Sequence, residues 1–339
     1  MRKIVAALLA TLVSALFAAP AHAEGGDVTW TVRTAANSYG DDRTSYSYAI
    51  NPGGTIKDAM VVANRGKAPL NLAVYTADGY TTDSGQLDLR NRDVKAVAVG
   101  TWARPAGATI TVPPGKTVEV PFTVTLPDNA TPGDYVGGIV TSLTQPSSTE
   151  TINVERRLGI RIKLRVGGDL KPALSIENLS VDWHGSVNPF AKGDAAVSYT
   201  IHNTGNATLS ATQALRVEGP FGMFRTDAAK IAAPPELLPG ESWKVSVPVH
   251  AVAAAFDLVA TATVTPVATD ASGSTSALPA IHADTHFRAV SWTLLLLIAL
   301  IVAAALIVRR NRARRSARED DRVQKAVADA LREKADTTA

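Results

Sequence analysis

The sequence contains no cysteine among its 339 residues. No disulfide framework can therefore hold the chain together, and neither a thiolate nucleophile nor a cysteine-ligated metal site is available. Any folded part has to be stabilised by ordinary hydrophobic cores. The stretch between the two long apolar runs, Glu24 to Ala289, is long enough for two domains of usual size, each with its own core.

Residue patterns of catalysis are scarce as well. Only six histidines occur, and His282 and His286 have a spacing that suits a metal only on a helix with a third ligand nearby. Neither a Gly-x-Ser-x-Gly elbow nor a phosphate-cradling glycine loop is present. We expect no enzymatic activity, no cofactor and no metal site, although catalysis by scattered carboxylates stays open at this stage.

Positive charge is scarce in the central part of the chain. The whole sequence has a net charge of +3 and a pI near 9.1, values that alone would suggest a nucleic-acid binder. Glu24 to Ala289, however, carries 22 Lys and Arg against 25 Asp and Glu, so the basic excess lies at the two ends. This distribution argues against nucleic acid as a partner and indicates targeting and membrane topology.

The longest apolar run is Val290 to Val308, which contains no charged residue. At ~1.5 Å per residue it would form a helix about 28 Å long, which matches the hydrocarbon core of a bilayer. Trp292 lies at the end where an indole favours the interface. We expect a single transmembrane helix at 290–308 and a cytoplasmic tail at 309–339. A buried helix of a soluble domain is the alternative, but it fits poorly with the arginines that follow directly: Arg309, Arg310, Arg312, Arg314, Arg315 and Arg318.

The N-terminus predicts export of everything before that helix. Arg2 and Lys3 precede an almost wholly apolar run, and Ala21-His22-Ala23 places small residues at the −3 and −1 positions of a signal-peptidase site. We expect a signal peptide at 1–23 and a mature chain that begins near Glu24. The expected location is the cell membrane, with a single pass, an extracellular N-terminal part and a cytoplasmic tail.

Alternating apolar residues predict a first antiparallel β-sandwich at 24–167. The clearest strand is Thr117 to Leu126, where every second residue is apolar, and Pro- and Gly-containing turns separate such runs. In Leu158 to Val166 the apolar residues share one face, while Arg161, Lys163 and Arg165 share the other. This basic row could attract an anionic wall polymer, but a solvated face that prevents strand pairing between molecules is the more common arrangement.

A second series of alternating strands predicts another sandwich at 168–269. The order of a strand, an Asn-x-Gly turn, a strand and a Pro-Gly turn repeats between the segments MVVANRGKAPLNLAV and VSYTIHNTGNATLSA and their successors. We therefore expect an all-β part made of two related immunoglobulin-like antiparallel sandwiches in tandem. Residues 270–289, rich in Ser, Thr, Ala and Pro, are predicted to form a stalk. In the tail, Asp320 to Lys334 is expected to be helical.

The first domain resembles the peptidoglycan-binding domain of the WxL-interacting proteins, which are membrane-anchored surface proteins of Gram-positive bacteria. Ser45 to Thr81 is similar to the opening of that domain, with a tyrosine strand, a Pro-Gly turn and a strand that ends in Asn. Val112 to Leu143 is similar to its later block, which ends in Gly-Gly-Ile, and RRLGIRIKLRV is similar to its closing strand. The resemblance implies a sandwich that binds peptidoglycan, followed by an immunoglobulin-like domain that engages a secreted surface protein.

The residues that would contact a glycan are predicted from chemistry, because sugar rings stack on aromatics whose neighbours offer carboxylates or amides. Tyr75, Asp78, Tyr80 and Trp102 are the candidates, since they fall near predicted loops. For Tyr75 and Trp102 a place in the hydrophobic core is an equal alternative.

Three functions compete at this stage. The leading hypothesis is a non-enzymatic surface protein that binds peptidoglycan through its first sandwich and is anchored by a single helix. The alternative is an assembly or adhesin-like protein whose sandwiches bind a partner protein. An envelope hydrolase is the third, and it would need a cleft with paired carboxylates or a metal.

Overall fold

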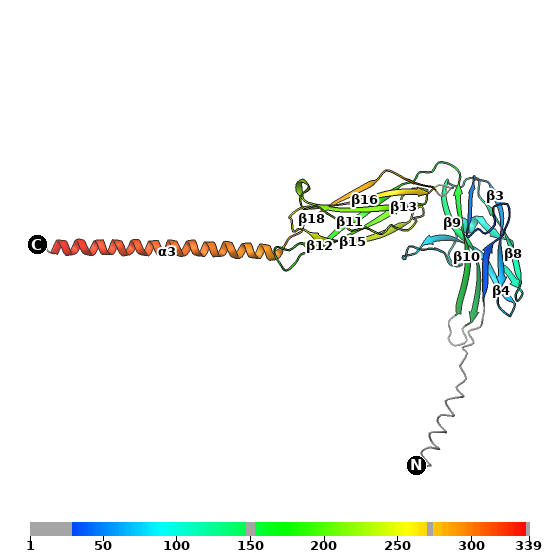
Figure 1. Cartoon of the computed structure of the whole chain (residues 1–339), viewed down its shortest axis with the longest axis horizontal. Helices are drawn as coiled ribbons and strands as arrows, with labels where there is room; N and C mark the ends of the chain where they lie inside the picture. The colour runs from blue at the N-terminus through cyan, green and yellow to red at the C-terminus, as the bar shows by residue number, and fades with distance from the viewer. Residues whose placement is uncertain (1–28, 147–152, 270–273, 337–339) are drawn as a thin grey trace, which may run out of the picture. The chain divides into compact units, whose positions relative to one another are not determined.

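The computed structural model describes residues 29–146, 153–269 and 274–336 and is mostly β, with one long C-terminal helix (Figure 1). The chain separates into two compact units: the first ends at Asp169, and the second begins at Leu170 and also includes Asp83–Gln86. The predicted signal peptide lies outside the described residues. Each unit has its own hydrophobic core, as expected for a chain without disulfides.

The first unit consists of two sheets around one core. One sheet has the order β1-β3-β8-β6, with these strands at Trp30–Thr34, Thr55–Asn64, Thr117–Thr125 and Ala103–Pro105. The other has the order β2-β10-β9-β4-β5, with β7 paired to β4. Its strands lie at Tyr46–Ile50, Asn153–Val166, Gly133–Pro146, Leu70–Thr81, Leu87–Leu89 and, for β7, Thr109–Val112. A one-turn helix, α2 at Val99–Trp102, precedes β6.

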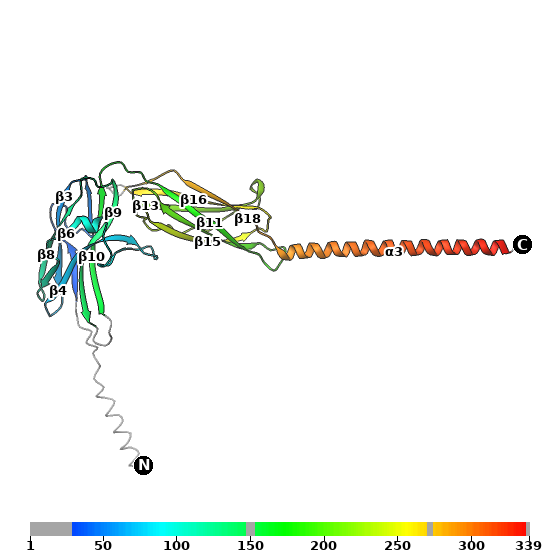
Figure 2. The ribbon, with the colours of Figure 1, turned by 180° about the vertical axis from the view of Figure 1, so that it is seen from behind.

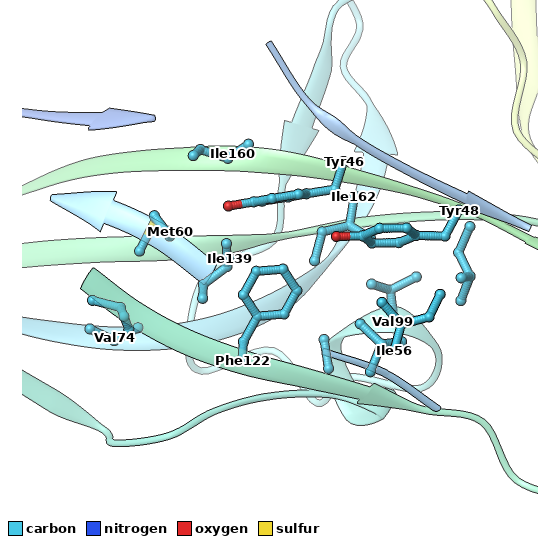
Figure 3. Close-up of a cluster of buried hydrophobic side chains, with 14 of the residues drawn as sticks. Tyr46, Tyr48, Ile56, Met60, Val74, Val99, Phe122, Ile139, Ile160 and Ile162 are labelled. Atoms are coloured by element: carbon cyan, nitrogen blue, oxygen red, sulfur yellow. The ribbon is translucent and has the colours of Figure 1, made fainter. Parts of the chain in front are cut away.

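The period-two patterns decide which side chains form this core. The alternation predicted for Thr117 to Leu126 is confirmed, because Val120, Phe122 and Val124 are all buried. Figure 3 shows the rings of Tyr46 and Tyr48 side by side above Phe122. Tyr46 stacks on Tyr48 at 6.1 Å between ring centroids and meets Phe122 edge-to-face at 4.9 Å.

One strand pair departs from the antiparallel prediction. β10 runs parallel to β2, with Ile162 opposite Tyr46 and Val166 opposite Ile50. Strands joined by a short turn must be antiparallel, but these two are separated by most of the unit, so the chain can return in either direction. The sequence pattern of each strand is the same in both cases and does not reveal the direction.

The second unit also has two sheets. One has the order β11-β12-β15, at Leu174–His184, Gly193–Asn203 and Ser242–Val252. The other has the order β14-β13-β16-β17, with β18 also paired to β16. Its strands lie at Thr226–Asp227, Leu209–Glu218, Leu258–Thr269, Thr275–Ala277 and Ile281–Phe287. A 3-10 turn at Pro220–Gly222 lies between β13 and β14.

The predicted stalk at 270–289 is wrong for its described part. β17 and β18 pair with β16, and Ala289 is 1% exposed within the core of the second unit. The second domain therefore extends beyond the predicted boundary at 269. The composition of this stretch concealed a period of two, in which Ile281, Ala283, Thr285 and Phe287 are half-buried and the alternate residues are exposed.

The last element is one continuous helix, α3 at Trp292–Asp336, which includes the helix predicted separately in the tail. Over Trp292–Ala326 it is long and apolar enough to cross a membrane, with a mean hydropathy of 2.5 in its most apolar window and none of that window buried. Figure 2 shows α3 leaving the end of the second unit as an isolated helix.

A buried asparagine confirms the predicted likeness between the two sandwiches. Asn64, 1% exposed, donates from Nδ2 to the carbonyls of Ala68 at 2.8 Å and Val112 at 2.9 Å, and its Oδ1 accepts the Gly66 N–H at 2.8 Å. Asn203, fully buried, makes the same three bonds at 2.8, 2.9 and 3.0 Å, with Ala207, Leu237 and Gly205. The Asn-x-Gly turn is thus one structural device used twice.

Candidate functional site

The four predicted glycan contacts do not form one cluster. They lie on or near β4, whose even-numbered residues face the core and whose odd-numbered residues face outward. Asp78 and Tyr80 therefore share the inner face, beside α2 and Trp102, whereas Tyr75 lies on the outer face.

Asp78 is buried, and its carboxylate holds α2 in place. It accepts the backbone N–H groups of Val97 at 2.7 Å, Ala98 at 3.3 Å and Gly100 at 2.8 Å. The hydroxyl of Thr76 donates to the carbonyl of Gly100 at 3.0 Å. Since both carboxylate oxygens of Asp78 are used by these bonds, the structure gives this residue a positioning role for the segment before β6.

Trp102 and Tyr80 lie at the same end and are half-buried. The Trp102 ring packs against the core and meets Tyr135 edge-to-face, with 4.8 Å between centroids. The guanidinium of Arg90 lies over the Tyr80 ring at 4.8 Å from its centroid, a cation–π arrangement. Of the predicted set, Tyr80 thus still offers an aromatic group near the surface, together with Arg90, which was not predicted.

Tyr75 is buried, at 9% exposure, in a small apolar cluster on the outer face with Ala77, Val140 and Leu89. Its hydroxyl faces Arg157 and raises the pKa of that guanidinium above its ordinary value, so Arg157 stays charged. Arg157 also donates from Nη1 to the carbonyl oxygen of Leu89 at 3.4 Å. The aromatic ring of Tyr75 is therefore part of the apolar packing of the outer face.

The Gly-Gly pair of β9 creates a notch that admits neighbours on both faces of the sheet. A Cβ on Gly137 would lie 2.6 Å from the Cβ of Val99, which packs from the core side. A Cβ on Gly138 would overlap Leu89, which packs from the outer side and also lies over Gly159. The missing side chains let neighbours approach closely here, and the notch is where β5 and α2 pack against the sheet.

The basic row of β10 lies on this outer face. Arg157 and Arg161 flank Gly159, and Lys163 and Arg165 follow on the same side. Arg165 forms a bidentate ion pair with Asp134, at 2.6 and 2.9 Å. Arg161 is exposed and has no ion pair within the parts of the chain that the structure describes. We call these four residues the basic face.

A buried charged network beneath the β1–β2 connection went unnoticed at the sequence level. Asp58 is fully buried in its side chain and pairs with Arg43, with 2.7 Å between Oδ2 and Nη1. Its carboxylate also accepts the Tyr48 hydroxyl, Asn37 Nδ2 at 2.6 Å and the Ala59 N–H at 2.7 Å. Burial alone would raise the pKa of Asp58, but these hydrogen bonds together hold it below its usual value.

Arg43 in this network lies between aromatic rings, 5.9 Å from the Tyr39 centroid and 5.3 Å from that of Tyr46. Burial raises the pKa of both Tyr46 and Tyr48, so these hydroxyls stay protonated. The sequence did contain a signal, because in the strand TIKDAMVVAN Asp58 falls on the same alternate positions as Ile56, Met60 and Val62, which are apolar. A buried charge at such a position needs a partner, and the sequence does not reveal that Arg43 is that partner.

The second unit carries a polar concavity of about 700 Å³ beside β13, β16 and β18. Arg216, Asp227 and His282 line it, and His282 Nδ1 lies 2.9 Å from the hydroxyl of Thr263. His282 and His286 are on a strand and not on a helix, and His286 pairs with Asp257 at 3.2 Å. Within the described ranges no group of three His, Cys, Asp or Glu side chains is placed to hold a metal.

Comparison with solved structures finds proteins that are similar to most of the chain at low sequence identity. The class 5 fimbriae chaperone CfaA is 12% identical, with 75% of this chain and 99% of that chain covered and a TM-score of 0.35. The E. coli chaperone DraB is 11% identical, with 75% and 98% covered and a TM-score of 0.33. No curated protein sequence matches the chain.

A family description matches the first unit. The match begins in β1 and ends near the end of β9, so it includes the Asn64 turn, the α2 segment and the Gly137-Gly138 notch. The resemblance found in the sequence is thereby confirmed. The N-terminal part of the chain, at residues 31–142, is a WxL Interacting Protein, peptidoglycan binding domain.

Proposed function

We propose that this chain is a non-enzymatic cell-surface protein that binds peptidoglycan through its first unit and is anchored in the membrane by α3. The family match at residues 31–142 is the observation that carries this proposal. The exposed cationic groups of the first unit support it, because peptidoglycan stem peptides bear carboxylates that such groups attract.

The anchor is proposed from α3 and the residues at its ends. Trp292 is exposed at the first turn, where an indole favours the membrane interface. After the apolar run come Arg309, Arg310, Arg312, Arg314 and Arg315, which are all exposed. An excess of arginine marks the cytoplasmic side of a spanning helix, so both β units would lie outside the membrane.

We assign the wall contact to the basic face. This face is flat because Gly138 and Gly159 have no side chains and Leu89 fills their notch. Arg161 offers five donors that are not committed to an ion pair within the described chain. Arg157 is positioned by its hydrogen bond to the Leu89 carbonyl before a ligand arrives.

A sedimentation assay on insoluble peptidoglycan with the purified full chain in detergent tests this assignment. Reversing one exposed charge at Arg161→Glu should weaken binding about fivefold, since ~1 kcal/mol corresponds to that ratio. Arg104→Glu makes the same charge change on β6 in the other sheet, where Arg104 is exposed, and should bind like the wild type. Full recovery of the wild type in the supernatant would contradict peptidoglycan binding.

A partner protein is the second candidate, because the matched family is described as interacting with WxL proteins. Crosslinking on intact cells separates the two functions. One dominant protein adduct together with no retention on the wall would favour the partner protein over peptidoglycan.

A further inference from the structure

Three loops of the second unit meet at one end of its sandwich. They join β11 to β12 at 185–192, β13 to β14 at 219–225, and β15 to β16 at 253–257. The strand registers place them together, since Gly193 pairs with Val252 and Glu218 pairs with Val259. The end of β18 is there too, because Phe287 pairs with Leu258. We call these segments the helix-proximal loops, because α3 begins shortly after β18.

Large apolar side chains of these loops face outward. Scattered exposed apolar residues are normal, but such a concentration at one end marks a surface with a partner. At the opposite end of the same sandwich, within the described residues, only Leu170 is exposed among the large apolar residues, at 38%. The exposed residues of the loops are Val187 at 87%, Phe190 at 80%, Phe221 at 100%, Met223 at 50%, Phe224 at 55% and Phe256 at 72%.

The helix starts directly from this end of the sandwich. Ala289 is part of the core, and its N–H donates to the carbonyl of Ala255 in the 253–257 loop at 3.0 Å. Ser291 is also buried, and α3 begins at Trp292. Only a few residues therefore separate the core of the sandwich from the apolar helix. In Figures 1 and 2 the loops of this end lie beside the start of α3.

We propose that the helix-proximal loops insert their apolar side chains into the outer leaflet of the membrane, which is thus the partner of this surface. This inference rests on the proposed anchoring by α3. A spanning helix places its first turn at the interface, and side chains a few residues away are then within reach of the acyl boundary. Aromatic side chains are the residues most favoured there.

The charges near these loops indicate that the contact is apolar. Lys192, Arg225 and Arg288 are balanced by the carboxylates of Asp194, Asp227 and Asp257, all exposed. Arg288 lies over the ring of Phe256 at 5.2 Å and would stay at the level of the headgroups. Insertion should therefore occur without anionic lipid, unlike the binding of a polybasic segment.

The absence of cysteine allows a direct test with single labels on the full chain. Phe190→Cys, Phe221→Cys and Phe256→Cys would each carry a nitroxide, in vesicles of pure phosphatidylcholine. Accessibility to oxygen, which concentrates in lipid, is compared with accessibility to a water-soluble nickel complex. The three sites should gain oxygen and lose nickel accessibility relative to Thr204→Cys, an exposed position at the opposite end of the sandwich.

A fourth label at Leu300→Cys, in the apolar part of α3, separates the two proposals. Lipid accessibility at position 300 together with water accessibility at 190, 221 and 256 would overturn loop insertion and leave the anchor intact. Water accessibility at position 300 would overturn the anchor itself. If the loop labels are shielded from both reagents, a protein surface such as a second copy of the chain covers them, and the lipid contact is wrong.

Discussion

The two units share one turn device but differ in what their cores contain. Both bury an asparagine that bonds two carbonyls and a glycine N–H. The first unit also buries the ion pair of Asp58 and Arg43. In the second unit the buried polar residues of the described chain are only Asn203 and Ser291, and its ion pairs are exposed.

The first unit therefore uses buried charges to position a connection, whereas the second keeps its charges at the surface. A buried ion pair contributes little net stability, because desolvation offsets the attraction, but breaking one partner is costly. In the first unit the pair holds the β1–β2 connection and orients Tyr39 and Tyr46. In the second unit burial raises the pKa of Tyr199 to about 12, and its hydroxyl donates to Gln213 Oε1 at 2.6 Å.

Removal of the buried carboxylate should produce the largest difference in stability between the two units. Asp58→Ala leaves Arg43 partly buried without its counter-ion and should destabilise the first unit by about 3–5 kcal/mol. Hydrogen exchange should show this loss at β3, while β12 in the second unit keeps its protection. Asp227→Ala removes an exposed ion pair from the second unit and should change neither. Equal losses in both units would contradict the assignment.

The same residue predicts a pH dependence for the first unit. The folded pKa of Asp58 is below the unfolded value of about 4, so its stabilisation is present above that pH and is lost as the pH falls through the folded pKa. Acid unfolding monitored at β3 should therefore show this component in the wild type. The Asp58→Asn variant, which cannot titrate at this position, should lack it.

The shared asparagine offers a second, smaller test. Asn64→Ala and Asn203→Ala each remove two hydrogen bonds to backbone carbonyls and the acceptor of a glycine N–H, and each should cost about 2–3 kcal/mol. The costs should be similar but confined to different units, and they should add in the double variant, because each asparagine belongs to a unit with a separate core. A loss in one unit only would mean that the two turns are not equivalent.

Much of the fold could be predicted from the sequence because alternation and turn residues record it locally. The strand at Thr117 to Leu126 and the two sandwiches were predicted in this way, and the apolar helix was predicted from the length of its apolar run. The parallel pairing of β2 and β10 and the membership of β18 in the second sheet could not be predicted. Both depend on contacts between distant segments, and a strand's own pattern is the same wherever it pairs.

The candidate site was less predictable for the same reason. Position near a loop suggested that Tyr75 and Asp78 are accessible, but neighbours brought by β5 and α2 bury both. The Asp58 network was missed because the strand and the turn that supply its members each look ordinary alone. Only a charge inside an apolar strand pointed to it.

The glycine notch of β9 is another feature in which the two units differ, and filling it should cause the smallest loss of stability. β9 of the first unit has two adjacent glycines, whereas β16 of the second unit has none. Gly138→Ala would push against Leu89 and the Ile160 carbonyl, the latter 2.8 Å from the added Cβ, and should cost about 1–3 kcal/mol. Gly107→Ala meets its nearest atom at an ordinary 3.5 Å and serves as the control. If both variants unfold alike, Leu89 does not occupy the notch, and the flat basic face loses its structural basis.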